Sequence, residues 1–443
     1  MKSVAFCTLG CKVNQYETDA MEELFQKDGY EIRAFHEAAD VYVINTCTVT
    51  NMADRKSRQM LHRARKKNPD AVIVAAGCYV QAAEEAAKAD EAIDLIIGNN
   101  CKGQIVSMVE EFMQGREKRV KTIDINHTCD YEVMSISKVS EHTRAYIKIQ
   151  DGCNQFCSYC IIPYARGRVR SRQAEDILNE VTTLAASGYR EIVLTGIHVS
   201  SYGKDFVDGT GFGKTDALIR LVEALAQIPG VERIRFGSLE PGIITEGFVK
   251  RLAAIPQICP HFHLSLQSGC EATLKRMNRH YTPEVYAEKC DLLKKYFDRP
   301  AFTTDVIVGF PGETDEEFDA TEKFLDQIHF AEMHVFKYSP RKGTRAAVMP
   351  DQVDEKIKTL RSNRLIELGE RMMADYRELC KDKTLEVLIE EDIDVNGQTM
   401  WVGHSREYLK CVLACDHVQS KDVVRCQMTG EVGEDFVICE IMD

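Results

Sequence analysis

The chain lacks several features that define whole classes of proteins. Its longest apolar run, 71–80, is about half of the ~20 residues that a membrane-spanning helix needs. The first residues show no apolar segment followed by a small-residue cleavage site, so we expect no secretory signal and a cytoplasmic location. The 443 residues include one Trp, 11 Pro and 27 Gly, which excludes collagen-like and low-complexity chains. At ~150 residues per domain, the length predicts two to four globular domains.

Positive charge is also scarce. Lys and Arg number 56 against 69 Asp and Glu, which gives a formal net charge of −13. Non-specific binding to nucleic acid depends on Lys and Arg contacts to phosphates. The charge balance therefore disfavours a general polyanion binder, but it leaves room for a local basic patch.

Cysteine, in contrast, is abundant. The chain has 17 Cys, an odd number, so disulfides cannot pair all of them. In a reducing compartment disulfides are rare, and clustered cysteines indicate metal binding or catalysis.

Three regions differ in their pattern of apolar residues. In the first, short β-branched segments alternate with longer amphipathic stretches, which predicts a parallel sheet covered by helices. We expect its strands at 4–6, 41–44, 71–75 and 94–97 and its helices at 17–28 and 54–68.

The second region repeats this alternation six times and therefore predicts a partial (βα)6, TIM-like barrel, with its chemistry at the C-terminal ends of the strands. The expected strands are 145–149, 191–194, 233–236, 261–266, 303–308 and 332–336, and the expected helices are 174–186, 217–227, 283–296 and 315–327. A helical stretch at 351–382 then leads to an acidic, β-rich end, for which we expect a small antiparallel β domain. The expected fold class is α/β with these three parts.

The strongest local motif is DGCNQFCSYC at 151–160. Cys153, Cys157 and Cys160, here named the loop trio, follow the first expected barrel strand on one short loop. Their thiolates can face a single point, as an iron–sulfur cluster requires, and three thiolates leave one iron open for another ligand. Tyr159 can cover that open side. The alternatives are a zinc site without a nearby fourth ligand, or buried thiols.

A second set of cysteines is spread along the first region. Cys11, Cys47 and Cys78, here named the N-terminal trio, each follow a different expected strand. The C-terminal ends of parallel strands line one crevice, so these distant thiols can converge. The alternative is simple burial, because free Cys is among the most buried residue types. Cys7, within a strand, fits packing better.

The loop trio has the CxxxCxxC spacing of the radical S-adenosylmethionine superfamily, and further segments resemble that superfamily. TGI at 195–197 resembles its Gly-Gly-Glu motif but has one Gly and no Glu, whereas DVIVGFPGE at 305–313 resembles its fifth-strand motif. Ordinary packing of strand ends is the alternative. The cofactor contacts that the resemblance implies are Gly196, Glu240, Ser265, Gln267, Ile307 and Gly309.

Over essentially its full length the chain resembles the methylthiotransferase family of this superfamily. The matching segments are TLGCKVNQYET, NTCTVT, AAGCY, DGCNQFCSYCIIPYARGRVRSR, SLQSG, TDVIVGFPGET and YSPRKGTRA. The resemblance implies domains at 1–131, 139–375 and 376–443, the last a TRAM domain. TLGCKVNQYE resembles the branch that acts on threonylcarbamoyladenosine at position 37 of tRNA, next to the anticodon.

The resemblance also implies the chemistry. The loop trio would hold one 4Fe–4S cluster that binds S-adenosylmethionine and yields a 5′-deoxyadenosyl radical, which abstracts hydrogen from carbon 2 of adenine. The N-terminal trio would hold a second 4Fe–4S cluster that carries the sulfur, and a second S-adenosylmethionine supplies the methyl group. Carbon 2 has no leaving group for polar substitution, so the cofactors carry the difficult steps. The implied partners are tRNA, a reductant such as flavodoxin or ferredoxin, and a sulfur donor; we expect no membrane contact and a monomer.

RNA binding requires local positive charge. An alternating row in extended chain would share one side and could bind tRNA phosphates; its members are Arg166, Arg168, Arg170 and Arg172. Further basic stretches are 55–67 and 341–345, for which a solvated face is the alternative. In the acidic last domain, Trp401, Tyr408 and Lys410 could supply stacking and local contacts.

Two other functions compete with this interpretation. One is methylthiolation of a different substrate, either isopentenyladenosine in tRNA or a ribosomal protein. The other is a non-catalytic iron–sulfur RNA-binding protein, which predicts no cleavage of S-adenosylmethionine. Three cysteines at each site disfavour the latter, because a structural cluster gains from a fourth thiolate.

Overall fold

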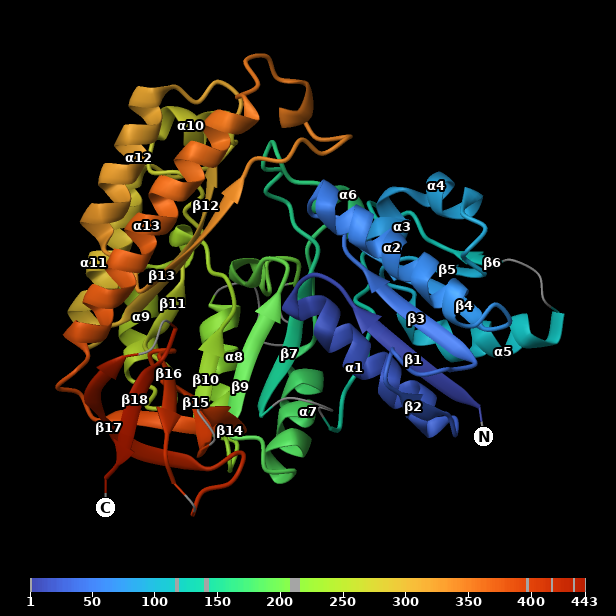
Figure 1. Cartoon of the computed structure of the whole chain (residues 1–443), viewed down its shortest axis with the longest axis horizontal. Coiled ribbons are helices and arrows are strands. Elements are labelled where there is room, and N and C mark those ends of the chain that lie inside the picture. The colour runs from blue at the N-terminus through green and yellow to red at the C-terminus, as the bar shows by residue number, and fades with distance from the viewer. Residues whose placement is uncertain are drawn as a thin grey trace.

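The computed structural model describes residues 2–115, 119–138, 143–207, 216–395, 398–415, 417–432 and 435–442. The predicted start of the second domain, 139–142, lies outside the described residues. The chain forms an N-terminal α/β domain, a central partial barrel and a small C-terminal β-barrel (Figure 1). In the described part of the chain, no helix combines the length and the apolar character needed to cross a membrane.

The N-terminal domain is a six-stranded sheet in the order β2-β1-β3-β4-β5-β6, and every neighbouring pair is parallel. The continuous apolar runs of β3 and β4 are buried along their whole length, as strands covered on both faces require. The elements are β1 (Ser3–Thr8), α1 (Lys12–Lys27), β2 (Glu31–Arg33), β3 (Val41–Thr46), α2 (Asn51–Lys67), β4 (Val72–Gly77), α3 (Cys78–Ala82), α4 (Glu84–Ala89), β5 (Leu95–Ile97), η1 (Lys102–Gln104), α5 (Ile105–Gly115) and β6 (Arg119–Lys121).

The four predicted strands of this domain are confirmed as β1, β3, β4 and β5. The sequence did not indicate β2 and β6, which are edge strands of three residues each and are only partly buried. Short edge strands carry too few apolar residues to show a period. Helix α1 begins at Lys12, five residues before the predicted start. The apolar pattern did not indicate this first turn, because polar residues face the interior there.

In the central domain, six parallel strands follow the order β7-β9-β10-β11-β12-β13, with β10 and β11 joined by isolated bridges. Strand β8 runs antiparallel beside β7. Its strands are β7 (Arg144–Asp151), β8 (Arg170–Ser171), β9 (Glu191–Gly196), β10 (Arg233–Phe236), β11 (His261–His263), β12 (Ala301–Val308) and β13 (Glu332–Lys337). The six predicted barrel strands are thus confirmed, although β11 ends three residues early.

Helices α7 (Ala174–Ala186), α8 (Ala217–Leu225), α9 (Glu246–Ala253), α11 (Pro283–Tyr296), α12 (Asp315–Ile328) and α13 (Glu355–Leu379) cover the outside of the partial barrel and bury their apolar faces on its strands (Figure 1). The shorter helices of this domain are α6 (Ile162–Ala165), which packs against α3, η2 (Val199–Ser201), η3 (Pro241–Ile243), α10 (Glu271–Arg276) and η4 (Ala346–Val348). The predicted connecting helix is α13, which packs against β12, β13 and α12.

The last domain closes into a five-stranded barrel in the order β14-β15-β16-β18-β17. Its neighbours are antiparallel except β16 and β18, which pair in parallel. The strands are β14 (Leu385–Val395), β15 (Gln398–Ser405), β16 (Lys410–Leu413), β17 (Val423–Val432) and β18 (Val437–Ile441). Strand β15 was not predicted, because its three apolar residues, 400–402, are consecutive and show no strand period.

The domains pack against one another at several places, among them the following two. Helix α1 of the first domain packs against β7 and β9 of the partial barrel. The ring of Tyr408, from the loop before β16, stacks on His261 with ring centroids 4.8 Å apart and lies 4.8 Å from the guanidinium of Arg235. Tyr408 therefore fastens the small barrel to the partial barrel and does not face outward to stack on a base, as the sequence suggested.

Candidate active site

The loop trio lies at the C-terminal end of β7, as its place in the sequence predicts. The loop folds back on itself, and the N–H of Cys153 donates to the carbonyl of Gly167 at 3.0 Å. Gly152 has a φ of +70°, and a Cβ at this position would lie 1.8 Å from the carbonyl oxygen of Arg168. Only glycine permits this return of the chain.

The surroundings of the loop trio suit a metal group, which binds cysteines in their deprotonated form. Burial, with a smaller contribution from the neighbouring Cys157, raises the pKa of Cys153 to about 11 and that of Cys160 to about 12. Arg279 donates from Nη1 to the Sγ of Cys157 at 3.3 Å. The thiols of Cys153 and Cys160 are therefore protonated near neutral pH until a metal group displaces their protons.

A cavity of about 410 Å³ opens beside this loop at the ends of β9 and β10. Arg279 donates from Nη2 to both carboxylate oxygens of Glu240, at 2.7 and 2.9 Å, and both side chains line the cavity. Burial, with help from Lys204 and Arg279, lowers the pKa of the lining residue His198 to about 4, so its imidazole is neutral at pH 7. The size and the mixture of paired charges with apolar wall suit a polar cofactor.

The N-terminal trio converges as predicted, although its members are up to 67 positions apart in the chain. Cys11 precedes α1, Cys47 follows β3, and Cys78 is the first residue of α3 after β4. Burial raises the pKa of Cys47 to about 11, and the other two thiols of the trio are close enough to raise it further. Cys47 and Cys78 are buried, whereas Cys11 is exposed.

Tight turns hold these thiols together. Gly10 has a φ of +104°, and a Cβ there would lie 2.8 Å from the Sγ of Cys47. Asn14 ties two of the strand ends by donating from Nδ2 to the carbonyls of Leu9, at 2.6 Å, and Thr46, at 3.0 Å. The turns are thus fixed before any ligand binds.

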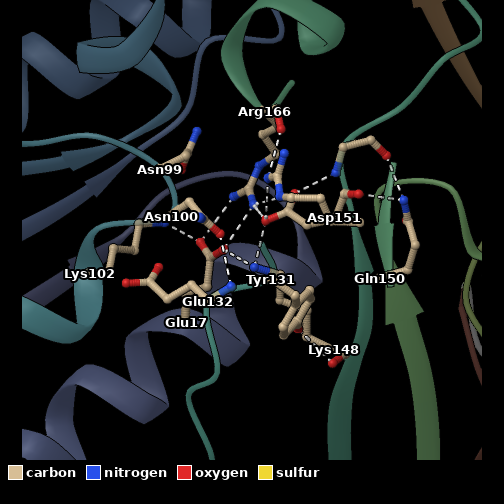
Figure 2. A network of polar contacts seen from close by, with 12 residues as sticks. Glu17, Asn99, Asn100, Lys102, Tyr131, Glu132, Lys148, Gln150, Asp151 and Arg166 are labelled. Atoms are coloured by element: carbon tan, nitrogen blue, oxygen red, sulfur yellow. Dashed lines mark hydrogen bonds and ion pairs between the residues drawn. The ribbon is translucent and has the colours of Figure 1, made fainter. Parts of the chain in front are cut away.

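A buried network of charges lies between the two trios (Figure 2). Arg166 donates from Nε to the Sγ of Cys78 at 3.2 Å and from Nη1 to Glu17 at 2.8 Å and to Asp151 at 3.1 Å. Lys148 bridges the same two carboxylates, at 2.6 Å from each. Burial alone would raise the pKa of Glu17, but the surrounding cations, including Arg166, hold it well below its ordinary value.

The donor sets fit iron–sulfur clusters. Each trio offers three soft thiolate ligands and has basic hydrogen-bond donors beside its sulfurs, which suits an anionic cluster. Among the described residues, no group of three or more His, Cys, Asp or Glu is arranged to hold a single metal ion. A four-iron cluster is larger than one ion and needs thiols that are spread more widely.

Comparison with known proteins agrees with this geometry. Residues 147–325 match the radical SAM superfamily, and residues 3–98 match a family described as the uncharacterized protein family UPF0004. The chain is 43% identical over 413 residues to the threonylcarbamoyladenosine tRNA methylthiotransferase MtaB of Bacillus subtilis, covering 93% of this chain and 90% of that one. It is 35% identical over 436 residues to the tRNA-2-methylthio-N(6)-dimethylallyladenosine synthase of Pelotomaculum thermopropionicum, covering 97% and 96%.

The chain belongs to the radical SAM tRNA methylthiotransferases. It is therefore an enzyme, and its cofactors are S-adenosylmethionine and 4Fe–4S clusters. Among solved structures, the radical S-adenosylmethionine methyltransferase TsrM from Kitasatospora setae, with cobalamin and a [4Fe-4S] cluster bound, aligns with a TM-score of 0.56. That alignment has 14% identity and covers 79% of this chain and 77% of that one, so it supports the fold alone.

Of the six predicted cofactor contacts in this methylthiotransferase, Glu240 lines the cavity. Gly196 ends β9, whereas Ser265 and Gln267 follow β11, all at the same edge of the barrel. Ile307 packs with Tyr159 in a small apolar cluster beside the loop trio. These positions agree with the edge that the sequence predicted, but contact with the cofactor stays a prediction.

Gly309 has a more specific structural role. It has a φ of +69°, its N–H donates to Glu313 at 2.7 Å, and a Cβ there would lie 2.3 Å from the Cγ of Lys358 on α13. This glycine allows α13 to pack closely against the end of β12.

The predicted arginine row does not face solvent, and this expectation is corrected. Arg166, Arg170 and Arg172 are at most 1% exposed. Arg172 pairs with Glu180, and Arg170 donates to the carbonyl of Arg166 at 2.9 Å. The row does not form an extended strand beyond β8, so its members do not share one open side. Arg168 is half-buried, 4.5 Å from the ring of Phe156.

Positive charge does reach the surface on α2. Arg55, Lys56, Arg58, Arg63, Lys66 and Lys67 are exposed there. The loop that carries exposed Lys342 and Arg345 lies against the start of α2, because Arg341 forms an ion pair with Asp54 at 2.6 Å. The second and third predicted basic stretches therefore adjoin one another.

Sequence reasoning missed several residues of the site. Arg279 lies in a segment without a distinctive local pattern, so no signal marked it. Asn99 donates to the Sγ of Cys78 at 3.5 Å and lies two residues after the end of β5, and His198 lies two residues after the end of β9. The rule that identified the N-terminal trio, polar groups just past parallel strands, could have identified Asn99 and His198 as well.

Proposed function

We propose that the enzyme methylthiolates carbon 2 of N6-threonylcarbamoyladenosine at position 37 of tRNA. The observation that carries this proposal is the 43% identity to MtaB across 93% of the chain, which exceeds the 35% identity to the dimethylallyladenosine synthases. The two cysteine trios support it, because sulfur transfer needs a radical source and a sulfur carrier in one enclosed place.

The loop trio is the proposed site of the radical cluster. Its cluster and S-adenosylmethionine, when bound, supply a 5′-deoxyadenosyl radical. The chain's own part is to hold the cofactor in the adjoining cavity, where Glu240 is fixed by Arg279 at 2.7 Å and can accept hydrogen bonds from a ribose. Neutral His198 keeps that end of the cavity free of a second positive charge beside Arg279.

The N-terminal trio is the proposed site of the second 4Fe–4S cluster, which carries the sulfur. Gly10 and Asn14 hold the three thiols in place, and exposed Cys11 marks the side from which the target base would approach. The chain therefore supplies a rigid cradle with one open side.

For the RNA we propose the exposed basic face of α2 together with Lys342 and Arg345, in place of the buried arginine row. These cations can neutralise phosphates locally although the net charge of the chain is −13. The proposed partners also include a low-potential reductant and a sulfur donor, and we propose a monomer. Free thiol ligands suit a reducing compartment, so we propose the cytoplasm as its location.

Nucleoside analysis of tRNA tests the proposal. The enzyme is expressed in a bacterial host that lacks its own 2-methylthiolation of threonylcarbamoyladenosine, and digested tRNA is examined by liquid chromatography and mass spectrometry. We expect 2-methylthio-threonylcarbamoyladenosine with the wild type and none with Cys153→Ala or Cys47→Ala. A mass increase on isopentenyladenosine or on a ribosomal protein would identify a different substrate, and no cleavage of S-adenosylmethionine in purified enzyme would identify a non-catalytic protein.

A further inference from the structure

Arg166 connects two domains at the N-terminal trio. Its Nε donates to the Sγ of Cys78 at 3.2 Å and its Nη2 donates to Asn14 at 2.6 Å, so it touches one candidate ligand and the residue that frames the others. Arg166 itself belongs to the central domain, directly after α6. A candidate ligand of the first domain is therefore hydrogen-bonded by a fully buried cation of the second.

The charges around this contact do not balance. The cations of the network are Arg166, Arg170, Lys102 and Lys148, and its carboxylates are Glu17, Asp151 and Glu132. A surplus cation is costly inside a protein unless an anion lies beside it. An anionic group held at Cys78, whose sulfur accepts from the Nε of Arg166 at 3.2 Å, would supply that charge.

Two carboxylates hold the guanidinium in this orientation. Nη1 donates to Glu17 at 2.8 Å and to Asp151 at 3.1 Å, which leaves Nε–H pointing at the sulfur. Asp151 lies two residues before the loop trio, so the same contact couples the position of that loop to the N-terminal trio. A planar guanidinium can satisfy all of these acceptors at once, whereas a lysine ammonium cannot reproduce the fork.

We propose that Arg166 is a positioning residue of the N-terminal trio, and that its charge-assisted hydrogen bond to Cys78 raises the reduction potential of the group held there. The inference rests on the proposed function in one respect, namely that this trio holds a 4Fe–4S cluster. Reduction adds negative charge to a cluster, and hydrogen bonds and cations at its sulfurs favour the reduced form. The N-terminal site is then complete only when the two domains are docked.

Glu17 provides a matched control. It belongs to the same buried network and pairs with Arg166, yet among the described residues no hydrogen bond joins its carboxylate to a cysteine of the trio. Glu17→Gln weakens the network without removing the Nε–H donor, and it removes a negative charge. A purely structural role for Arg166 predicts the same kind of damage from both substitutions, whereas a role at the sulfur predicts opposite shifts in potential.

The test uses the full-length Cys153→Ala/Cys157→Ala/Cys160→Ala protein, so that only the N-terminal trio can hold a cluster. After anaerobic reconstitution, the reduced cluster is followed by electron paramagnetic resonance during a redox titration. At the midpoint of this parent protein, we expect Arg166→Gln to lower the ratio of reduced to oxidised cluster about tenfold, the scale of one charge-assisted hydrogen bond. Glu17→Gln should raise the ratio, and Arg166→Lys should recover only part of the loss, because it restores the charge without the hydrogen-bonding fork.

The outcomes separate the inference from the proposed function. A parent protein that binds no iron overturns both the placement of the second cluster and the inference. A parent that binds about four iron, with Arg166→Gln unshifted or shifted in the same direction as Glu17→Gln, overturns the inference alone. If Arg166→Gln fails to hold a cluster, Asn99→Leu is used instead, because Asn99 also donates to the sulfur of Cys78. A lower ratio of reduced to oxidised cluster in Asn99→Leu supports the role of donors at this sulfur, and an unchanged ratio contradicts it.

Discussion

Single residues decide whether the thiols of each trio can meet. At Gly10 the backbone has a φ of +104° and passes so close to Cys47 that a Cβ would lie 2.8 Å from its Sγ. At Gly152 the nearest atom to a Cβ would be a carbonyl oxygen, at 1.8 Å. Glycine is therefore required at these turns by close approach as well as by backbone conformation.

Gly10→Ala tests this requirement at the N-terminal trio. The added methyl must displace Cys47, so we expect iron to fall from about eight to about four per chain, the loss of one four-iron cluster. Gly29→Ala is the control, because it also has a positive φ, +84°, but its Cβ would meet nothing within 4 Å. That variant should lose only about 1–2 kcal/mol of stability through backbone strain and keep its iron. Equal iron in the two variants would contradict the account.

His198 gives a prediction about pH. Its pKa is lowered to about 4 in the folded protein, chiefly by burial, from an ordinary value near 6.5. Between these values the unfolded chain binds the proton and the folded chain does not, so stability falls as pH drops from 6.5 toward 4. We expect His198→Asn to remove about 2–3 kcal/mol of that fall. The measurement is chemical unfolding at pH 7, 6, 5 and 4.5, and parallel curves for the two proteins would contradict the prediction.

At the scale of elements, the sequence indicated the long and strongly patterned segments correctly. The barrel strands and helices α7, α11 and α12 lie where their apolar periods placed them, within a few residues. Strands β2 and β6 were missed, because three-residue edge strands leave no clear period, and β15 was missed because its three apolar residues are consecutive and do not alternate. The parallel pairing of β16 with β18 depends on how the chain closes the barrel, and no local sequence pattern predicts it.

The arginine row shows why side-chain type alone misleads. Four alternating arginines suggested a phosphate-binding strip, but three are buried, and Arg166 and Arg172 pair with Glu17 and Glu180. Those partners become visible only when the fold is known. Helix α2, in contrast, has few apolar residues to bury, and its basic residues remain at the surface.

Substitutions on α2 test its proposed contact with tRNA. Arg55→Glu/Lys56→Glu/Arg63→Glu reverses three exposed charges, so we expect tRNA affinity to fall at least about tenfold and the salt dependence of binding to become shallower, by about one unit of slope for each lost phosphate contact. Filter binding across a salt series measures both. Lys323→Glu on α12, an exposed lysine on the outside of the barrel, is the control and should change neither. An equal loss of tRNA affinity in the control would show that the net charge of the protein, and not the position of these residues on α2, causes the effect.

At the scale of the whole molecule, domain docking rests on a few buried contacts. Tyr408 has a φ of +76° and lies between His261 and His404, with Arg144 5.1 Å and Arg235 4.8 Å from its ring. Buried cation–π contacts of this kind contribute up to about 2 kcal/mol each. The strained backbone is thus held by tertiary contacts at the base of the partial barrel.

Tyr408→Ala tests this attachment. We expect faster hydrogen exchange in 398–415 and in 233–236, the segments that meet at the ring, with little change in the N-terminal sheet. Phe336→Ala, at a ring that is 49% exposed, is the control and should leave exchange in these segments unchanged. Unaltered exchange in Tyr408→Ala would show that other contacts hold the small barrel.

The sequence predicted where in the molecule the candidate site lies, but it did not predict the contacts within the site. Both trios could be placed at the C-terminal ends of strands, because strand order and cysteine position are local facts. The contact between Arg166 and Cys78, the clamp of Arg279 on Glu240 and the cavity beside them join segments 39 to 88 residues apart. Such contacts arise from how three domains pack together, which no single segment specifies.

The central claim is that two cysteine trios hold two clusters, and counting iron tests it most directly. Iron and acid-labile sulfide are measured per chain after anaerobic reconstitution, in the wild type and in Cys153→Ala/Cys157→Ala/Cys160→Ala. The account predicts about eight iron in the wild type and about four in the triple variant, from two four-iron clusters. About four iron in the wild type and none in the variant would contradict it, because Cys11, Cys47 and Cys78 would then hold no cluster.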